Sequence, residues 1–383
     1  MTPDHDFIVE SLAALVRINS INPAFSGGTT DESAIAEHVA GEMERLGMTV
    51  ERFEPRPGRV SVLGRLRGTG GGRSLMLYAH LDTVGVEGMP EPFSADVRGG
   101  RMHGRGAYDM KCGIAACLGA VKALRDGGVR LAGDLLLAFV ADEEVASIGM
   151  EDLLRHATAD AAIVTEPTEL RLCLAHKGFC WIEVETLGRA AHGSRFQEGI
   201  DANLRMGRFL ARLETLEREL RARPPHPLVG PPSLHAAVLR GGTGASTYAA
   251  HCALTIERRM VPGETEASVL AETQAIVDAL SAEDKTFRAT VRASLTRGSF
   301  EADADAPIAR AVAAAAAEVL GAAPETIGEP YWMDAALLAD AGISTVVLGP
   351  RGAGAHADDE WVELDSVVHL AEILARAAAG FRG

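Results

Sequence analysis

Acidic and imidazole side chains in this 383-residue chain gather where apolar, strand-like segments end, although they lie far apart in the sequence. The segments are 74–79, 134–141, 161–166 and 343–349, and the glycine-rich turn GRGAYDMK leads into a helix-like segment. The polar residues at these places are His80, Asp82, Asp109, Glu143, Glu144, Glu166 and His356. Because the carboxyl ends of strands in an open parallel sheet face one crevice, these side chains could meet there.

Carboxylates and histidines in one crevice would favour a bound transition metal. Taken singly, a histidine at a strand end is more often a surface residue, and adjacent glutamates are usually solvated. Together, Asp109, Glu143, Glu144 and Glu166 would repel one another if all were ionised, so they must hold protons or bind a cation. The two imidazoles point to zinc and its neighbours rather than to calcium.

Charge counting favours two metal ions. Two divalent ions would be neutralised by three carboxylate ligands and one bridging hydroxide, which leaves the fourth carboxylate free to act as a base. Two ions about 3.5–4 Å apart can activate a water molecule and stabilise both reacting oxygens. Asp82 could point the same way as His80, accept a hydrogen bond from the imidazole and fix its tautomer. The alternative is that Asp82 only caps a turn.

The elements around these residues predict an α/β domain with a second domain inserted into it. Up to about residue 178, buried strands alternate with helices such as 110–126, which indicates a largely parallel sheet. From 179 to 295 the order becomes β-α-β-β-α-β with alternating strands, typical of a ferredoxin-like α+β layer. After 296 the α/β pattern returns, so we expect one discontinuous domain, 1–178 with 296–383, and an inserted domain, 179–295.

The composition excludes several classes of protein. The chain has 37 Lys and Arg against 53 Asp and Glu, a net charge of −16, which argues against a nucleic acid partner. The five cysteines show no CxxC spacing, so we expect buried reduced thiols and a cytoplasmic protein. We predict no membrane association, because there is neither a signal peptide nor a long apolar run. The glycine runs 68–73 and 241–246 lack a P-loop lysine and are better explained as turns than as nucleotide sites.

Seven motifs, in this order between about residues 78 and 365, resemble the M20 metallopeptidase and deacylase family, which includes acetylornithine deacetylases and glutamate carboxypeptidases. They are AHLDTV, GRGAYDMKCG, ADEEVASIGM, TEPT, GRAAHGS, ERRMVPGE and GPRGAGAHADDE. The resemblance implies a zinc-peptidase-like catalytic domain and an inserted domain that acts as lid and dimerisation domain.

The resemblance also implies a set of metal ligands. His80, Asp109 and Glu166 would hold one ion, and Asp109, Glu144 and His356 would hold the other, with Asp109 bridging. Zinc is expected, with cobalt or manganese as alternatives. The peptide bond after Asp109 is expected to be cis.

The family's catalytic roles map onto three further residues. Glu143 would be the general base that moves a proton from water to the leaving amine, and Asp82 would orient His80. His192 in GRAAHGS would stabilise the oxyanion, from the same chain or from the partner subunit of a homodimer.

Substrate contacts are expected from three segments. Arg259 would grip a substrate carboxylate, with Arg258 as the competing candidate. Ser246 stands where the family usually has an asparagine that touches substrate, and Ala249 where it has a proline. Gly352 completes the expected substrate-binding residues.

These expectations describe a two-metal amidohydrolase that cleaves a small N-acyl amino acid of the acetyl or succinyl type. A carboxypeptidase or dipeptidase acting on short peptides with a free carboxylate is an open alternative. A metal-binding relative without activity is a further one, although the full set of ligands and base argues against it.

Overall fold

A computed structural model describes residues 1–381 of the chain, which divides into two compact units. The first contains Met1–Leu174, Ala302–Ile327 and the chain from Met333 onward, and the second contains Ala175–Glu301 and Gly328–Trp332. The boundaries expected from the sequence, 178/179 and 295/296, differ from these by several residues. No sequence pattern indicated that Gly328–Trp332 belongs with the inserted part.

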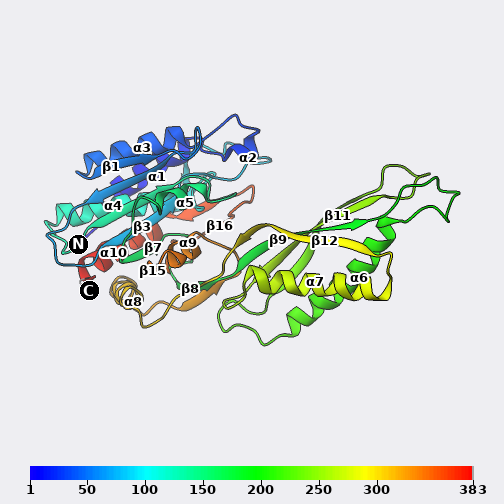
Figure 1. Ribbon diagram of the computed structural model, residues 1–383. Helices are drawn as coiled ribbons and strands as arrows, with labels where there is room; N and C mark the ends of the chain where they lie inside the picture. The colour runs from blue at the N-terminus through cyan, green and yellow to red at the C-terminus, as the bar shows by residue number, and fades with distance from the viewer. Residues whose placement is uncertain (382–383) are drawn as a thin grey trace. The chain divides into compact units, whose positions relative to one another are not determined.

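The first unit contains most of a large mixed sheet, which Figure 1 shows between its helices, and residues 175–176, 300–301 and 328–329 of that sheet are assigned to the second unit. In sheet order the strands are β1 (Thr49–Phe53), β2 (Ser61–Leu66), β6 (Leu135–Val140), β3 (Leu75–His80), β7 (Ala161–Val164), β15 (Ser344–Val347), β8 (Leu172–His176) and β13 (Phe300–Glu301), with β14 (Thr326–Glu329) beside β8. The central strands β6, β3, β7 and β15 run parallel, and the outer ones are antiparallel. The predicted α/β class with a mostly parallel centre is therefore confirmed.

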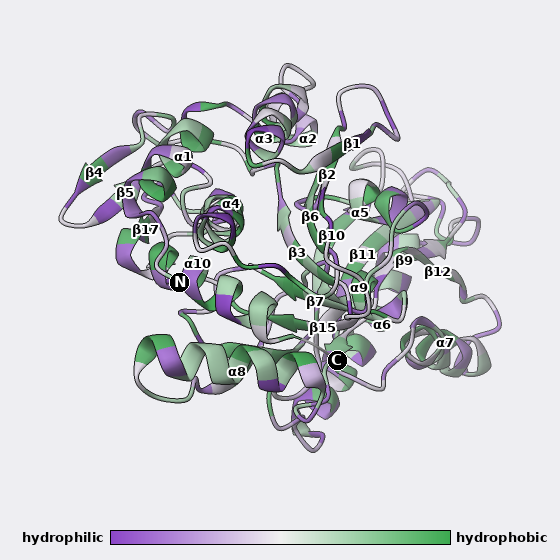
Figure 2. Cartoon of the chain, turned by 90° about the vertical axis from the view of Figure 1, so that its left-hand side faces the viewer, coloured by the Kyte–Doolittle hydropathy of each residue, from purple (hydrophilic) through white to green (hydrophobic). Residues whose placement is uncertain are grey.

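Helices cover this sheet because its central strands are apolar on both faces, and Figure 2 shows β3, β7 and β15 in hydrophobic colours. The helices are α1 (His5–Arg17), α2 (Pro23–Ser26), α3 (Ser33–Arg45), α4 (Lys111–Asp126), α5 (Ile148–Leu153), α8 (Pro307–Leu320), α9 (Ala335–Asp340) and α10 (Leu364–Gly380). Gly119 of α4 permits close packing of α1, since a Cβ there would lie 2.5 Å from Cγ1 of Ile8. A small antiparallel sheet completes the unit, in the order β16 (Gly352–Ala353), β17 (Trp361–Glu363), β5 (Arg101–His103) and β4 (Asp96–Arg98).

The second unit has the predicted β-α-β-β-α-β order. Its elements are β9 (Gly178–Leu187), α6 (Ala202–Ala222), β10 (Ser233–Gly241), β11 (His251–Met260), α7 (Glu266–Glu283) and β12 (Arg288–Arg297). The strands form an antiparallel sheet in the order β10-β11-β9-β12, and both helices lie on one of its faces. Strand residues alternate between the core and the other face, as the sequence pattern indicated.

Two smaller predictions can be checked against the structure. All five cysteines are buried and unbridged, as expected. In the described part of the chain, residues 1–381, no helix combines the length and the apolar character needed to cross a membrane.

Candidate metal centre

Strand register brings the first polar residues together at the carboxyl edge of the parallel sheet. β3 and β7 pair with Tyr78 opposite Val164, so His80 and Glu166, each two residues further on, reach the same level. His80 Nε2 lies 3.6 Å from Glu166 Oε1, and both side chains are buried. On the other side of β3, His80 pairs with Val140 of β6, so the segment 142–144 emerges beside it.

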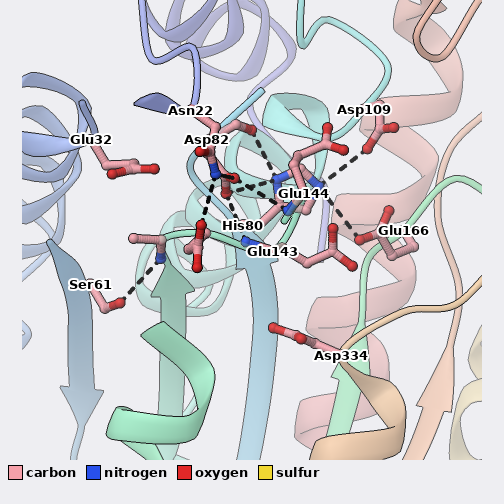
Figure 3. Close-up of polar contacts among 12 residues, drawn as sticks. Asn22, Glu32, Ser61, His80, Asp82, Asp109, Glu143, Glu144, Glu166 and Asp334 are labelled. Carbon is pink, nitrogen blue, oxygen red and sulfur yellow. Dashed lines mark hydrogen bonds and ion pairs between the residues drawn. The ribbon is translucent and has the colours of Figure 1, made fainter. Parts of the chain in front are cut away.

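Asp109 lies between the two histidines, with one oxygen toward each. His80 Nε2 is 3.2 Å from Asp109 Oδ1, and His356 Nε2 is 3.3 Å from Asp109 Oδ2. His356 Nε2 also lies 3.0 Å from Oε2 of Glu144. Figure 3 shows the carboxylates of Asp109, Glu144 and Glu166 around the His80 imidazole. One carboxylate that faces two imidazoles is the arrangement that a bridging ligand requires.

Two groups of potential ligand atoms result, each with its atoms within 4.8 Å of one another. The first consists of His80, Asp109 and Glu166, and the second of Asp109, Glu144 and His356. These are the two sets that the family resemblance assigns to two metal ions. The Asp109–Met110 peptide bond is cis, as expected.

Without a metal, protons must balance the charges of this cluster. Burial and the neighbouring carboxylates, against the opposing effect of the histidines, raise the pKa of Glu166 to about 8 and that of Glu144 to about 7. Hydrogen bonds to Asp109 and Glu144 raise the pKa of His356 to about 10. Burial opposes ionisation of Asp109, but the two histidines outweigh it and lower its pKa. The cluster therefore holds several protons near neutral pH that a cation could replace.

The donor set fits divalent transition metals. Oε1 of Glu144 and Oε1 of Glu166 are buried without a hydrogen-bond partner, a costly condition that coordination would relieve. Nδ1 of His80 lies 3.0 Å from the backbone oxygen of Asp82, which can only accept, so this nitrogen carries the proton. On loss of the proton that faces Asp109, Nε2 of His80 would offer its lone pair to a metal. Mixed imidazole and carboxylate ligands suit zinc and related ions.

Asp82 holds a different position from the one expected. Its carboxylate lies 3.7 Å from Nδ1 of His80, while its backbone oxygen makes the closer contact. The carboxylate instead accepts the backbone N–H groups of Glu143, at 3.1 Å, and Glu144, at 3.3 Å. The alternation rule fails here because β3 ends at His80, so Asp82 is no longer part of a strand. Asp82 therefore fixes the segment that carries Glu143 and Glu144.

The candidate base Glu143 lies beside the metal ligands in Figure 3 and is partly buried. Burial and nearby carboxylates, including Asp334, raise the pKa of Glu143. Asp334 is itself fully buried and accepts a hydrogen bond of 2.5 Å from the Tyr78 hydroxyl. Sequence reasoning missed Asp334, since one aspartate before a short apolar helix is indistinguishable from a helix cap.

A buried polar network that no sequence pattern predicted contacts the side chain of Asp82. Asn22 donates to Asp82, at 2.8 Å, and to Asp142, at 2.9 Å. Arg59 Nη2 lies 2.7 Å from both Asp142 and Glu32. Asp142 adopts a left-handed φ of 72° directly before Glu143, and its backbone oxygen closes the following turn. The network thus ties the 142–144 segment to two distant parts of the chain.

The inserted unit holds His192, Ser246 and the two candidate arginines, and the structure brings the first two together. His192 forms an isolated antiparallel bridge with Thr247, and the N–H of Gly193 donates to the oxygen of Ser246 at 2.7 Å. His192 and Ser246 are exposed, and Nδ1 of His192 lies 2.8 Å from the Ser194 hydroxyl.

The structure separates the two candidate arginines. Arg258 is buried and contacts the carboxylates of Glu264, at 2.5 Å, and Glu272, at 3.3 Å. Arg259 points to the other face of the sheet, where its side chain is 31% exposed, pairs with Glu257 at 2.9 Å and lies over the Phe179 ring. Arg259 is therefore the more available of the two for a ligand.

Gly352 is explained by packing. Its N–H already donates to Glu169, at 3.1 Å, and a Cβ there would lie 2.5 Å from the Tyr108 ring. The structure therefore gives a reason for glycine at this position that does not involve substrate.

Known proteins that resemble this chain agree with the geometry of the candidate metal centre. Residues 76–380 match the peptidase family M20/M25/M40. The chain is 31% identical to an acetylornithine deacetylase of Myxococcus xanthus over 360 residues, covering 91% of this chain and 92% of that protein. It is 30% identical to the N-formyl-4-amino-5-aminomethyl-2-methylpyrimidine deformylase of Bacillus subtilis (strain 168), covering 89% of this chain and 87% of that protein.

A solved structure shows the same fold. The YXEP protein of Bacillus subtilis, described as a dinuclear metal binding peptidase from the M20 family, superposes with a TM-score of 0.75 at 15% sequence identity. The superposition covers 98% of this chain and 97% of that one.

Proposed function

The chain belongs to the peptidase family M20/M25/M40, which makes it a hydrolase of amide bonds, and from this premise we propose that it is a two-metal deacylase of N-acyl amino acids. The observation that carries the proposal is Asp109, whose two oxygens face the imidazoles of His80 and His356. The ligand groups on either side of it support two cations rather than one.

The chemistry begins with the metals and is completed by side chains. Two divalent ions bound by these residues would lower the pKa of a water molecule and polarise the substrate carbonyl. Glu143 takes the proton of the attacking water and later delivers it to the leaving amine. Burial raises the pKa of Glu143, which makes it a stronger base toward water than an exposed glutamate. The hydrogen bonds of Asp82 keep the backbone of Glu143 in place during both transfers.

Two residues of the inserted unit complete the proposal. His192 donates a hydrogen bond to the developing oxyanion, within one chain or across a homodimer. Arg259 binds the carboxylate of the amino acid product, a task for which a planar guanidinium is well suited. The commitment of Arg258 to Glu264 and Glu272 supports this assignment.

A substrate panel tests the proposal. The purified protein would be analysed for bound metal and assayed in parallel on N-acetyl, N-succinyl and N-formyl amino acids and on dipeptides. We expect metal-dependent release of a free amino acid from at least one N-acyl substrate. Cleavage of dipeptides alone would favour the peptidase alternative. Two bound metal ions with no turnover on the whole panel would refute the proposal.

The substrate panel can also distinguish a deacylase of amino acids from a deformylase of amines without a carboxylate. The substrate in the name of the deformylase relative is a formylated aminomethylpyrimidine, whereas an N-acyl amino acid carries a carboxylate. Including N-formyl amines without a carboxylate therefore separates the two activities. A preference for these amines would exclude the role proposed for Arg259.

A further inference from the structure

The loop that presents Asp109 is organised around one buried carboxylate, that of Glu360. Its Oε1 accepts the backbone N–H groups of Tyr108, at 2.9 Å, and Asp109, at 3.0 Å. Its Oε2 accepts the N–H of Gly106, at 3.0 Å, and Nη1 of Arg105, at 2.6 Å. Glu360 is fully buried, so all four donors are held by a side chain that has no contact with water.

Arg105 extends this arrangement to the loop that carries His356. The arginine is 3% exposed, and its Nε donates to the backbone oxygen of Gly85 at 2.9 Å. Its Nη2 donates to the backbone oxygen of Ala357, the residue after His356, at 3.0 Å. Each nitrogen of the guanidinium is thus engaged, one of them with Glu360.

Backbone pairing continues the connection. β17 pairs with β5, and the N–H of Gly104 donates to the oxygen of Glu360 at 3.1 Å just beyond that ladder. The segments 104–109 and 356–360 are therefore joined by backbone bonds on one side and by the Arg105–Glu360 ion pair on the other.

We infer that Glu360 and Arg105 are positioning residues for the second metal position, since they set the distance between Asp109 and His356. The inference rests on the proposed two-metal function and adds to it two residues that touch neither metal nor substrate. His356 needs such support, because its side chain is 55% exposed and its φ of 62° is unusual for a residue other than glycine.

The expected effect follows from the narrow range of metal–ligand distances that a metal site tolerates. Ligand distances in metal sites vary by only about 0.2 Å, so a small shift of one loop against the other would spoil the geometry. Loss of a group that orients a ligand typically weakens metal binding about 10–100-fold. In a glutamine at position 360, an amide NH₂ would replace one acceptor and face the donors of the 105–109 loop.

The test compares E360Q with D359N, a matched carboxylate-to-amide change on the same loop. Asp359 is exposed, and among the described residues the polar partner of its carboxylate is the His103 imidazole, at 3.2 Å. Metal-free samples of wild type, E360Q and D359N would be titrated with zinc by calorimetry and by equilibrium dialysis. We expect the weaker of two zinc equivalents to bind about 10–100-fold more weakly in E360Q and within about threefold of wild type in D359N.

A second variant, R105K, keeps the inference testable if E360Q does not fold. R105K keeps the positive charge but loses the fork that reaches both Gly85 and Ala357, so it should weaken the same equivalent. If the folded variants bind both equivalents within about threefold of wild type, the inference is overturned. If wild type itself binds fewer than two equivalents, the proposed function fails together with the inference. Two tight equivalents in both wild type and variants refute the inference alone.

Discussion

Arg59 is the only cation that the structure places against the buried carboxylates of Glu32 and Asp142 within the described chain, so replacing it should destabilise the protein. Arg59 is 9% exposed, Glu32 is fully buried and Asp142 is 4% exposed. Methionine in place of Arg59 would keep much of the packing volume but leave both carboxylates without a charge partner. Asn22 would still donate to Asp142, whereas the carboxylate of Glu32 would have no cation against it among the described residues.

The magnitude follows from the two contacts of 2.7 Å. At an effective dielectric constant of 20, each attraction is about 6 kcal/mol before desolvation is subtracted. Measured losses on removing one partner of a buried pair are about 3–5 kcal/mol, so we expect R59M to lose about that much free energy of unfolding at pH 8.

The free energy of unfolding that R59M loses should depend on pH, because Glu32 titrates. Burial, with the Asp82 charge as the next cause, raises the pKa of folded Glu32 from 4.5 to about 8. The folded state therefore favours the protonated form: this stabilisation is fully present below about pH 4.5 and is lost as the pH rises through about 8. Arg59 opposes the shift, so its removal raises the folded pKa of Glu32 further. The stability difference between wild type and R59M should thus be smallest near pH 5 and grow toward pH 9.

Urea unfolding at pH 5 and pH 9 of wild type, R59M, E32Q and R59M/E32Q would measure these differences. The double variant should recover at least about 1 kcal/mol relative to R59M at pH 9, because it removes the unpaired charge. A free energy of unfolding of R59M within about 1 kcal/mol of wild type at pH 8 would refute this role of Arg59. A stability difference between R59M and wild type that shrinks as the pH rises would refute it as well.

Three further predictions concern the site itself. E143Q should lower kcat by about 10²–10⁴-fold while the metal content measured by mass spectrometry stays unchanged, and a loss below about tenfold would exclude Glu143 as the base. The metal-free protein holds protons on His356, Glu166 and Glu144, whose pKa values are raised to about 10, 8 and 7. Because zinc must displace these protons, calorimetry should show tighter zinc binding as the pH rises from about 6 to 8. A zinc affinity independent of pH would contradict this prediction. R259A should raise KM about 10–100-fold for substrates with a free carboxylate and leave their carboxamide analogues unaffected, whereas an equal loss on both would rule out carboxylate recognition.

Much of the fold and of the metal cluster could be predicted because both depend on simple periodic rules. Apolar strands alternating with helices predict a parallel sheet, and parallel strands carry their following residues to one edge. This is why His80, Glu144 and Glu166 could be placed together from the sequence. The β-α-β-β-α-β order of the inserted unit follows from the same kind of pattern.

The supporting residues could not be predicted, since each acts through contacts that have no fixed spacing. Arg59 meets Glu32 and Asp142 from far along the chain, and a lone arginine in a polar segment resembles a surface residue. Glu360 likewise stands in an acidic run, ADDE, in which nothing marks one carboxylate as buried. The contacts of Asp82 were mispredicted because the alternation rule was extended two residues past His80, the last residue of its strand.

Diffraction from crystals grown with zinc, recorded at the zinc absorption edge, tests the central claim most directly. We expect two anomalous peaks, one contacted by His80 and Glu166, the other by Glu144 and His356, and both by Asp109. A single peak at full zinc occupancy, or two peaks that do not share Asp109, would contradict it.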